Sequence, residues 1–395
     1  MVRPSRLGTL TFGLQIVWGA VLGVSLQARS EALAGPHAVA VYSIVAAVGA
    51  GIATLVQVSA GYAADLRRAA VGHRREFLLV GTAMSVPAIF WLYLAPSVTQ
   101  FAAAFFLLQI AMNVVTAPYQ AAIPDYVPAE RRGEASSWMS AWQSLGNALG
   151  LVTVVVLSAR WAVPTVLAAV LLGAFAVTYR HVRSLAALPT SQTAFRVDGT
   201  FLTLLVSRGT VNLGFFTLVG YLLFFVRESL GVVGEAVRTQ TGLLFLTFTL
   251  AAVLGAALAS RPSDRYDMRA VATVANVLIV LALATLATSH SLAIAYAAAA
   301  IAGTAWGGFF TADWALACAL LPRGAMATAM GVWNIATAGP QILAPLLAAP
   351  LLLHVDALAP TMGPRATILL AVAEFAFGTA LLWLLPATRA VPVEV

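Results

Sequence analysis

Three ionisable residues lie inside long apolar runs of this sequence: Arg208, Asp313 and Glu374. Because a charged group is costly to bury at membrane depth, each is a candidate for function. Arg208 follows the start of its run by about eight residues and Asp313 precedes the end of another by about eight, so both would lie about 12 Å from one membrane face. Arg208 and Asp313 could therefore form an ion pair.

Two interpretations of that pair remain open. It could be a permanent salt bridge between two helices. Alternatively, Arg208 could hold an anionic or hydroxylated solute by its forked donors while Asp313 loads a proton when the pair opens. Glu374 has the same two alternatives: a site on the solute or proton pathway, or a protonated or hydrogen-bonded side chain that faces a neighbouring helix.

Polar side chains also form stripes along several apolar runs. Gln109, Asn113, Thr116 and Gln120 follow the spacing i, i+4, i+7, i+11, which places them on one helix face. Hydrogen bonds between helices would explain any one stripe, whereas several stripes together favour a water-filled central cavity. The remaining candidates for the solute or proton pathway are Gln15, Trp18, Asn212, Trp306, which could stack on a ring of the solute, Asn334 and Gln341.

The composition identifies the chain as a polytopic membrane protein. Its 395 residues are 61% hydrophobic and 9% charged, whereas soluble domains have about 25% charged residues. The apolar runs are continuous, which predicts helices instead of a barrel with alternating polarity. At about 20 residues per span, we expect an all-α protein of about twelve transmembrane helices. The predicted spans are 8–28, 38–63, 77–97, 99–123, 137–158, 162–180, 201–226, 240–259, 270–289, 292–320, 328–353 and 366–386.

The arginines predict the orientation of the chain in the membrane. All 22 basic residues are arginine; sixteen fall on one set of alternate connections and five on the other. By the positive-inside rule, both termini are expected in the cytoplasm and the protein in the cytoplasmic (inner) membrane. The basic island Gly61 to Arg75 is expected to be a short aqueous loop between the second and third spans.

Several functional classes are disfavoured. The net charge of +7 and the pI of 10.1 could suggest a nucleic-acid binder, but the basic residues lie between apolar runs instead of on one soluble face. The single cysteine, Cys318, permits no intramolecular disulfide. No cysteine–histidine pair has metal-ligand spacing, no nucleophile–base pair appears and no GxxxxGK[ST] motif is present. We therefore expect no enzyme, no metal and no cofactor.

The second half of the chain repeats the first. Pro128 aligns with Pro322 and Trp142 with Trp333, and Gly61-x-x-x-Asp65 recurs as Ser260-x-x-x-Asp264-Arg265. The repeat predicts two pseudo-symmetric six-helix bundles, 1–183 and 201–395, joined by a cytoplasmic linker at 184–200.

These features resemble the major facilitator superfamily of secondary transporters. Its loop between the second and third spans commonly reads Gly-x-x-x-Asp-Arg-x-Gly-Arg-Arg, and Gly61, Asp65, Gly72, Arg74 and Arg75 are similar to it, although Leu66 follows the aspartate. The second copy keeps Asp264 and Arg265 but has Asp267 where glycine is usual. Further segments, including Pro124-Asp125 and Arg131-Arg132-Gly133, resemble sugar-transporter-like and uncharacterised bacterial branches.

The resemblance implies a role for the basic island as a conformational latch. Asp65 would face the start of the eleventh span near Thr328, where a carboxylate gains about 0.3–1 kcal/mol from the helix N-terminus. With Gly61, Arg74, Arg75, Asp264 and Arg265, it would hold the two halves together on the cytoplasmic side. The alternative is that the loop arginines only set topology and bind anionic lipid headgroups.

The resulting prediction is a monomeric secondary transporter that moves a small organic solute, with protons as the expected coupling ion. The resemblance places the first, fourth, seventh and tenth spans around the cavity, and hence Arg208 and Asp313 within reach of solute. Symport and antiport remain open, as do uptake of a sugar-like solute and efflux of amphipathic compounds. The alternative from another class is a non-transporting membrane receptor or assembly factor with the same fold.

Overall fold

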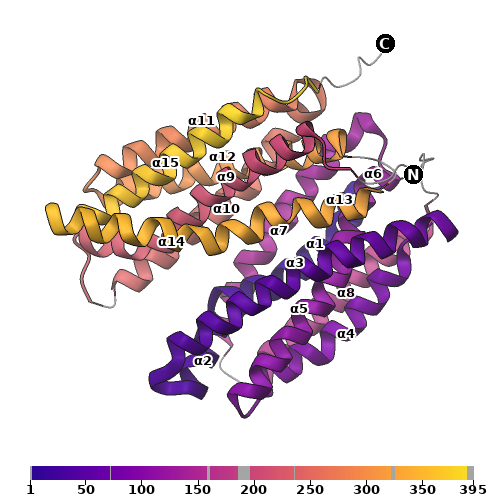
Figure 1. Ribbon diagram of the computed structural model, residues 1–395, viewed down its shortest axis with the longest axis horizontal. Helices are drawn as coiled ribbons and strands as arrows, with labels where there is room; N and C mark the ends of the chain where they lie inside the picture. The colour runs from indigo at the N-terminus through magenta and orange to yellow at the C-terminus, as the bar shows by residue number, and fades with distance from the viewer. Residues whose placement is uncertain are drawn as a thin grey trace. The chain divides into compact units, whose positions relative to one another are not determined.

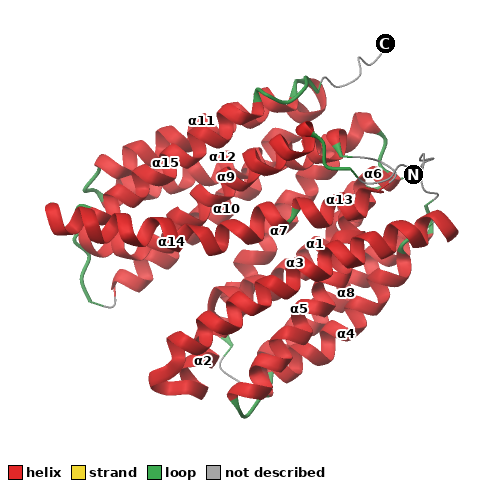
Figure 2. Cartoon of the chain, in the orientation of Figure 1, coloured by secondary structure: helices red, strands yellow, loops and turns green. Residues whose placement is uncertain are grey.

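The computed structural model describes residues 2–71, 73–157, 161–185, 196–234, 236–321 and 325–388. All regular secondary structure in these ranges is helical (Figure 2). Twelve helical segments are long and apolar enough to cross a membrane, which confirms the predicted fold class. Most of the predicted linker, together with Gly72 and Pro322, lies outside the described ranges.

The chain folds into two units (Figure 1). Unit 1 comprises Met1–Arg196 and Leu321–Asn334; unit 2 comprises Val197–Leu320 and Ile335–Val395. The helices of unit 1 are α1 (Pro4–Ala20), α2 (Leu26–Ala34), α3 (Ala38–Val71), α4 (Arg75–Leu94), α5 (Val98–Gln120), α6 (Ala122–Tyr126), α7 (Arg132–Val156), α8 (Ala162–Arg183) and α13 (Met326–Trp333). Those of unit 2 are α9 (Gly199–Phe224), α10 (Ala236–Arg265), α11 (Met268–Thr288), α12 (Leu292–Leu320), α14 (Ile335–Leu358) and α15 (Gly363–Leu382).

One sequence prediction about local structure is wrong. The island Gly61 to Arg75 is not a loop: α3 continues to Val71 and α4 begins at Arg75. The island is rich in alanine and arginine, which are strong helix formers, so the helix continues past the apolar run. The predicted span 328–353 falls within the candidate membrane span Met326–Leu358, which a turn at Asn334 divides into α13 and α14.

Glycines set the close approach of α1 and α7 in unit 1. A Cβ atom at Gly19 would collide with the backbone of Asn147, and one at Gly150 would collide with the backbone of Ile16. Gly146 and Gly150 of α7, and Gly19 of α1 with Gly23 just beyond its end, have the small-x-x-x-small spacing that lets helix backbones touch within a membrane. The interface therefore depends on the absence of side chains at these positions.

We expect Gly150→Ala to lower the stability of the protein by about 1–3 kcal/mol, because the added methyl group overpacks the interface. The matched control is Gly173→Ala on α8, where an added Cβ meets nothing within 4 Å. That control should be neutral or stabilising by about 0.4–1 kcal/mol, because alanine restricts the unfolded chain. Thermal unfolding in detergent measures both, and equal midpoints would contradict a tight interface.

The start of α1 is fixed by hydroxyl groups from two neighbouring helices. The Thr178 hydroxyl accepts a hydrogen bond from Leu10 N–H at 3.0 Å and donates to the Arg6 carbonyl at 3.0 Å. One residue further along, the Tyr119 hydroxyl accepts a hydrogen bond from Thr11 N–H at 3.1 Å and donates to the Leu7 carbonyl at 2.8 Å. Such insertions into the helical hydrogen-bond ladder are a recognised cause of bending. They anchor α1 to α8 and α5.

In unit 2, α12 is held in the bundle by α10 and α11. A Cβ at Gly307 of α12 would collide with the backbone of α10 at Ala252, and the same holds for Gly255 of α10 against Thr304 of α12. On its other side the unit is closed by α9, which packs against α14 and α15. These contacts fix the positions of the polar groups that α9 and α12 carry.

Candidate functional site

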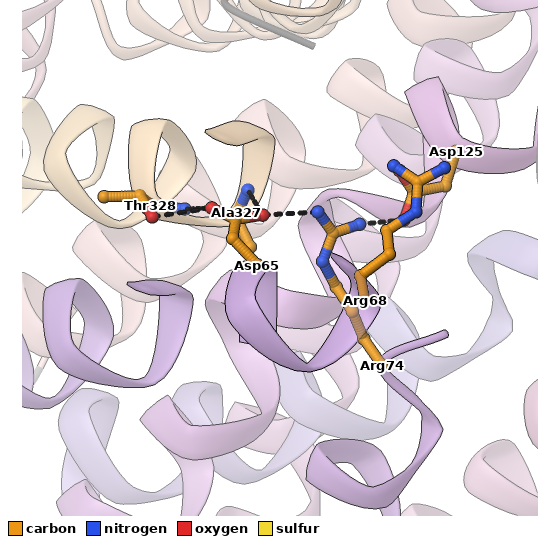
Figure 3. Close-up of polar contacts among 6 residues, drawn as sticks. All are labelled: Asp65, Arg68, Arg74, Asp125, Ala327 and Thr328. Carbon is orange, nitrogen blue, oxygen red and sulfur yellow. Dashed lines mark hydrogen bonds and ion pairs between the residues drawn. The ribbon is translucent and has the colours of Figure 1, made fainter. Parts of the chain in front are cut away.

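Asp65, in the second-last turn of α3, contacts the first turn of α13 (Figure 3). Its carboxylate accepts hydrogen bonds from Ala327 N–H at 3.1 Å, from Thr328 N–H at 2.8 Å and from the Thr328 hydroxyl at 2.6 Å. The first N–H groups of a helix lack intrahelical partners, and the helix dipole favours a negative charge there. The predicted contact with the start of the eleventh span is therefore present, in a buried position.

Arg74 joins Asp65 to a second carboxylate. Its guanidinium forms ion pairs with both Asp65 and Asp125, and Arg68 pairs with Asp125 at 2.6 Å (Figure 3). Burial acts to lower the pKa of Arg74, but the charges of Asp125 and Asp65 outweigh burial and raise the pKa above its ordinary value. Arg74 thus stays charged and links two carboxylates, a geometry that suits its planar fork of donors.

Gly61 has a steric role in the same place. A Cβ at Gly61 would collide with the Ala327 carbonyl, and a Cβ at Gly331 would collide with the backbone of Gln57. Two glycines, one on each helix, therefore allow α3 and α13 to approach until the Asp65 carboxylate reaches the N–H groups of α13. This explains why glycine and aspartate occur four residues apart.

Sequence motifs alone do not assign Arg68 and Asp125 to this cluster. Asp125 belongs to the Pro124-Asp125 pair, to which the family resemblance gives no role, and it lies in the short helix α6. The sequence does place the Asp125 carboxylate near the end of the fourth span, at the same membrane face as Arg74. This shared depth is the signal from which its pairing with Arg74 could have been predicted. The predicted Arg75 is half-buried at the start of α4 and lies near Tyr126.

The polar stripe of α5 connects that helix to α3 and α13. Asn113 accepts a hydrogen bond from the Gln57 side chain of α3 and donates to the Gln109 carbonyl at 2.7 Å. Gln120 and Asn334 exchange amide hydrogen bonds of 2.6 and 3.4 Å. Hydrogen bonds to other segments of unit 1 thus account for two members of the stripe, Asn113 and Gln120, while Gln109 is bound by Asn113 within α5.

The second copy of the island is arranged differently in unit 2. Asp264 is half-buried and Arg265 is exposed at the end of α10. Arg269 binds the neighbouring Asp267 with its Nε and Nη2 atoms at 2.6 to 3.2 Å and donates to the Leu385 carbonyl at 2.7 Å. Asp267, at the usual glycine position, therefore forms an ion pair with Arg269. In the first copy the corresponding arginine, Arg74, instead bridges Asp65 and Asp125.

Asp267 also begins α11, since its Oδ1 accepts from the Arg269 N–H at 3.0 Å. We expect Asp267→Ala to cost about 0.5–2 kcal/mol through loss of this cap, whereas Asp267→Asn keeps a capping oxygen and should cost less. Burial acts to raise the pKa of Asp267, but the Arg269 hydrogen bonds and charge outweigh it and lower the pKa. Its contribution is thus present at neutral pH and is lost as the pH falls through the lowered pKa.

The measurement is thermal unfolding of the wild type and both variants at neutral and acidic pH. The difference in unfolding midpoint between wild type and Asp267→Asn should become smaller on acidification, because the ion pair with Arg269 is then lost in the wild type. A constant difference at all pH values would refute a charged role for Asp267.

In unit 2, Arg208 of α9 and Asp313 of α12 form an ion pair. Both side chains are 3% exposed. The Arg208 Nη2 atom also donates to the Thr337 hydroxyl of α14 at 3.3 Å, and the Asn212 side chain donates to the Arg208 carbonyl at 3.0 Å. The equal depth inferred from the sequence is consistent with this pairing, which joins three helices.

An aromatic cluster lies beside the ion pair. The Arg208 Cζ atom is 5.3 Å from the centre of the Phe310 ring. Trp306 lies 5.4 Å from Phe310 and stacks on Phe215 with a centroid distance of 4.5 Å and an angle of 12°. Phe310 therefore connects Trp306 to the ion pair, and the Trp306 ring already lies against Phe215 of α9.

The remaining predicted residues are dispersed. Glu374 is 7% exposed and lies beside Thr217 of α9. Gln341 is exposed on α14, while Gln15 and Trp18 are half-buried on α1. The structure thus gathers the candidates into two groups, one around Asp65 in unit 1 and one around Arg208 and Asp313 in unit 2.

Comparisons with known proteins agree with this architecture. The general alpha-glucoside permease of Schizosaccharomyces pombe is 28% identical over 160 residues, which cover 35% of this chain and 27% of the permease. The human organic anion transporter MFSD10 has a similar fold, with a TM-score of 0.72 and 17% identity over 97% of this chain and 100% of that chain. The proton:xylose symporter XylE, with 6-bromo-6-deoxy-D-glucose bound, gives a TM-score of 0.63 and 14% identity over 98% of this chain and 95% of that one.

A bacterial homologue of the iron transporter ferroportin, in its outward-facing state, gives a TM-score of 0.69 and 14% identity over 96% of this chain and 100% of that chain. These solved structures establish likeness of fold. The family model of the Major Facilitator Superfamily matches residues 7–345, which is most of the sequence. The chain therefore belongs to the Major Facilitator Superfamily and is a multi-pass membrane protein.

Proposed function

We propose that this chain is a proton-coupled secondary transporter that moves a small organic solute across the cytoplasmic membrane by alternating access. The observation that carries the proposal is the Arg208–Asp313 ion pair, buried within unit 2 and shared by α9 and α12. Such a pair is stable only while both charges are compensated, so opening it requires partners for both groups. A solute and a proton are the partners that transport would supply.

The two groups of the pair differ in what they can accept. Arg208 cannot lose its proton at physiological pH, so it must keep an acceptor. Asp313 can become neutral by taking up a proton. Binding of a solute acceptor to Arg208 together with a proton to Asp313 therefore leaves no uncompensated charge, which couples the two bindings.

The cluster around Asp65 supports a latch in the same cycle. Its hydrogen bonds hold the start of α13, and α13 continues through Asn334 into α14 of unit 2. Breaking the Asp65 contacts would free the connection between the units and permit them to move. In this proposal Arg68, Arg74 and Asp125 fix the Asp65 carboxylate in position.

The proposal retains the topology inferred from the arginines: both termini cytoplasmic, bundles 1–183 and 201–395 with the linker at 184–200, and exposed arginines in contact with lipid headgroups. It includes protons as coupling ions, a monomeric protein and no catalysed reaction.

The test is transport by the purified protein in liposomes with an imposed pH gradient. The panel contains an α-glucoside, an amphipathic cation and small organic anions. Flux of at least one solute that depends on the gradient, and that a protonophore abolishes, is expected. No gradient-dependent flux of any member would overturn proton-coupled transport of these classes and favour a non-transporting role.

A further inference from the structure

The chemistry around Arg208 in unit 2 indicates which class of solute fits the site, an inference that rests on the proposed function. A cation bound at Asp313 would leave the guanidinium of Arg208 buried without its acceptor, at a cost typical of an unpaired buried charge. A neutral sugar would compensate neither charge. An anion can replace the Asp313 carboxylate on Arg208, and Asp313 can then be neutralised by a proton.

The geometry at Arg208 favours a carboxylate as that anion. Its guanidinium already forms an ion pair with the Asp313 carboxylate, and its Nη2 atom also contacts the Thr337 hydroxyl at 3.3 Å. A solute carboxylate has the same planar shape and charge as the group it would displace, and guanidinium binds such groups with two parallel hydrogen bonds.

The surroundings indicate what the rest of the solute would be. Phe310 lies 5.3 Å from the guanidinium carbon, and Trp306 and Phe215 continue the aromatic cluster away from it. Stacked and edge-to-face rings favour another flat ring as a neighbour. A solute with a carboxylate at Arg208 would place its body against these rings.

The apolar environment continues beyond the rings. The ring centroid of Phe248 of α10 lies 5.9 Å from that of Phe215 and 6.4 Å from that of Trp306. Phe248 also lines a cavity of about 40 Å³, together with Leu218, Leu222 and Ala298. The cavity lies among α9, α10, α11 and α12. Charge, aromatic cluster and apolar cavity therefore follow one another along α9.

We propose that the transported solute is an organic monocarboxylate with an aromatic body, bound by Arg208 and by the rings of Trp306, Phe215 and Phe310, while Asp313 takes up one proton. The proton moves from water to the Asp313 carboxylate as the ion pair opens, and it returns to water when the solute leaves. Net charge in the site is the same before and after binding.

The first experiment measures binding of 3-phenylpropionate to the full-length protein in nanodiscs by calorimetry in two buffers of different ionisation enthalpy. Uptake of about one proton per bound anion is expected, and the matched probes are 3-phenylpropanamide, 2-phenylethylamine, phenylalanine and 3-cyclohexylpropionate. The amide and the amine should bind at least 10-fold more weakly, and the cyclohexyl compound should bind more weakly than the phenyl one. Tighter binding of the zwitterion phenylalanine without proton uptake would overturn the proposal, as would equal binding of the amide.

Variants separate the roles of the residues. Arg208→Lys keeps the charge but loses the fork, so affinity for 3-phenylpropionate should fall about 10- to 100-fold. Trp306→Leu should reduce the preference for phenyl over cyclohexyl, whereas Trp161→Leu, at an exposed position in unit 1, should leave it unchanged. Equal phenyl preference in the Trp306 variant and the wild type would refute the aromatic part of the proposal.

The flux assay distinguishes the two levels of inference. Gradient-driven flux of the glucoside or the cation, with neither binding nor flux of 3-phenylpropionate, would overturn the solute class and leave proton-coupled transport standing. Binding of 3-phenylpropionate with proton uptake, but without gradient-driven flux of any solute, would support the site and overturn the transport cycle.

Discussion

Asp313→Asn is expected to abolish proton-driven accumulation of solute while leaving solute exchange in place. Asparagine cannot carry the coupling proton, whereas Arg208 remains available to the solute. The measurement compares uphill uptake under a pH gradient with exchange of solute at equal pH on both sides of the liposome. Uphill accumulation at the wild-type level would show that Asp313 has a structural role only.

The same substitution leaves Arg208 without its carboxylate partner. Removing one member of a buried ion pair costs about 3–5 kcal/mol, so Asp313→Asn should also unfold at a lower temperature than the wild type. The double variant Arg208→Gln with Asp313→Asn removes both charges and should recover much of that stability, but it should bind no solute at the pair. Recovery of stability with loss of function separates folding from coupling.

A matched control for the loss of a carboxylate is Glu130→Gln, at an exposed position of unit 1. Its stability and coupling should equal those of the wild type, because exposed charges contribute little. A loss of coupling in this control would show that the effect of Asp313→Asn comes from the change in net charge and not from the position of Asp313.

Asp65→Asn is expected to loosen α13. The carboxylate receives two N–H groups and one hydroxyl from Ala327 and Thr328 and also an ion pair from Arg74. An amide has one acceptor oxygen, and its NH₂ group would face donors. Hydrogen bonds to charged groups are worth about 1.5–3 kcal/mol, so amide exchange at the start of α13 should become about 10- to 100-fold faster.

Hydrogen–deuterium exchange of peptides that cover Met326–Trp333 measures this effect. Asp264→Asn, at the equivalent position of the second copy, is the control and should leave α13 unchanged. If the latch contributes to the cycle, Asp65→Asn should also change the rate of solute exchange. Equal protection of α13 in Asp65→Asn and in the wild type would refute the latch.

Much of the candidate chemistry was accessible from the sequence because the membrane makes polar groups conspicuous. In an apolar run, Arg208 and Asp313 stand out, and helix geometry alone gives them equal depth. Likewise, Asp65 and the start of the eleventh span were placed at one membrane face, and the family resemblance implied a contact between them. Such inferences use distance along one axis, which a helical span fixes at about 1.5 Å per residue.

Contacts across the bundle required the tertiary structure. Rotation of α3 and α6 about their own axes decides that Arg68 and Asp125 join Arg74, and no periodicity states which residue of another helix lies opposite. The second copy illustrates this point, since a single aspartate at 267 takes Arg269 and the symmetry of the repeat is lost.

The sequence by itself determined the class of fold, the twelve spans and the buried charges, because hydropathy and the cost of charge in lipid are properties of the residues alone. Only the tertiary structure decided that a turn at Asn334 interrupts the eleventh span and that Trp306 stacks on Phe215. These features depend on which donors, carbonyls and rings a neighbouring helix presents, and that is set by packing instead of by local preference.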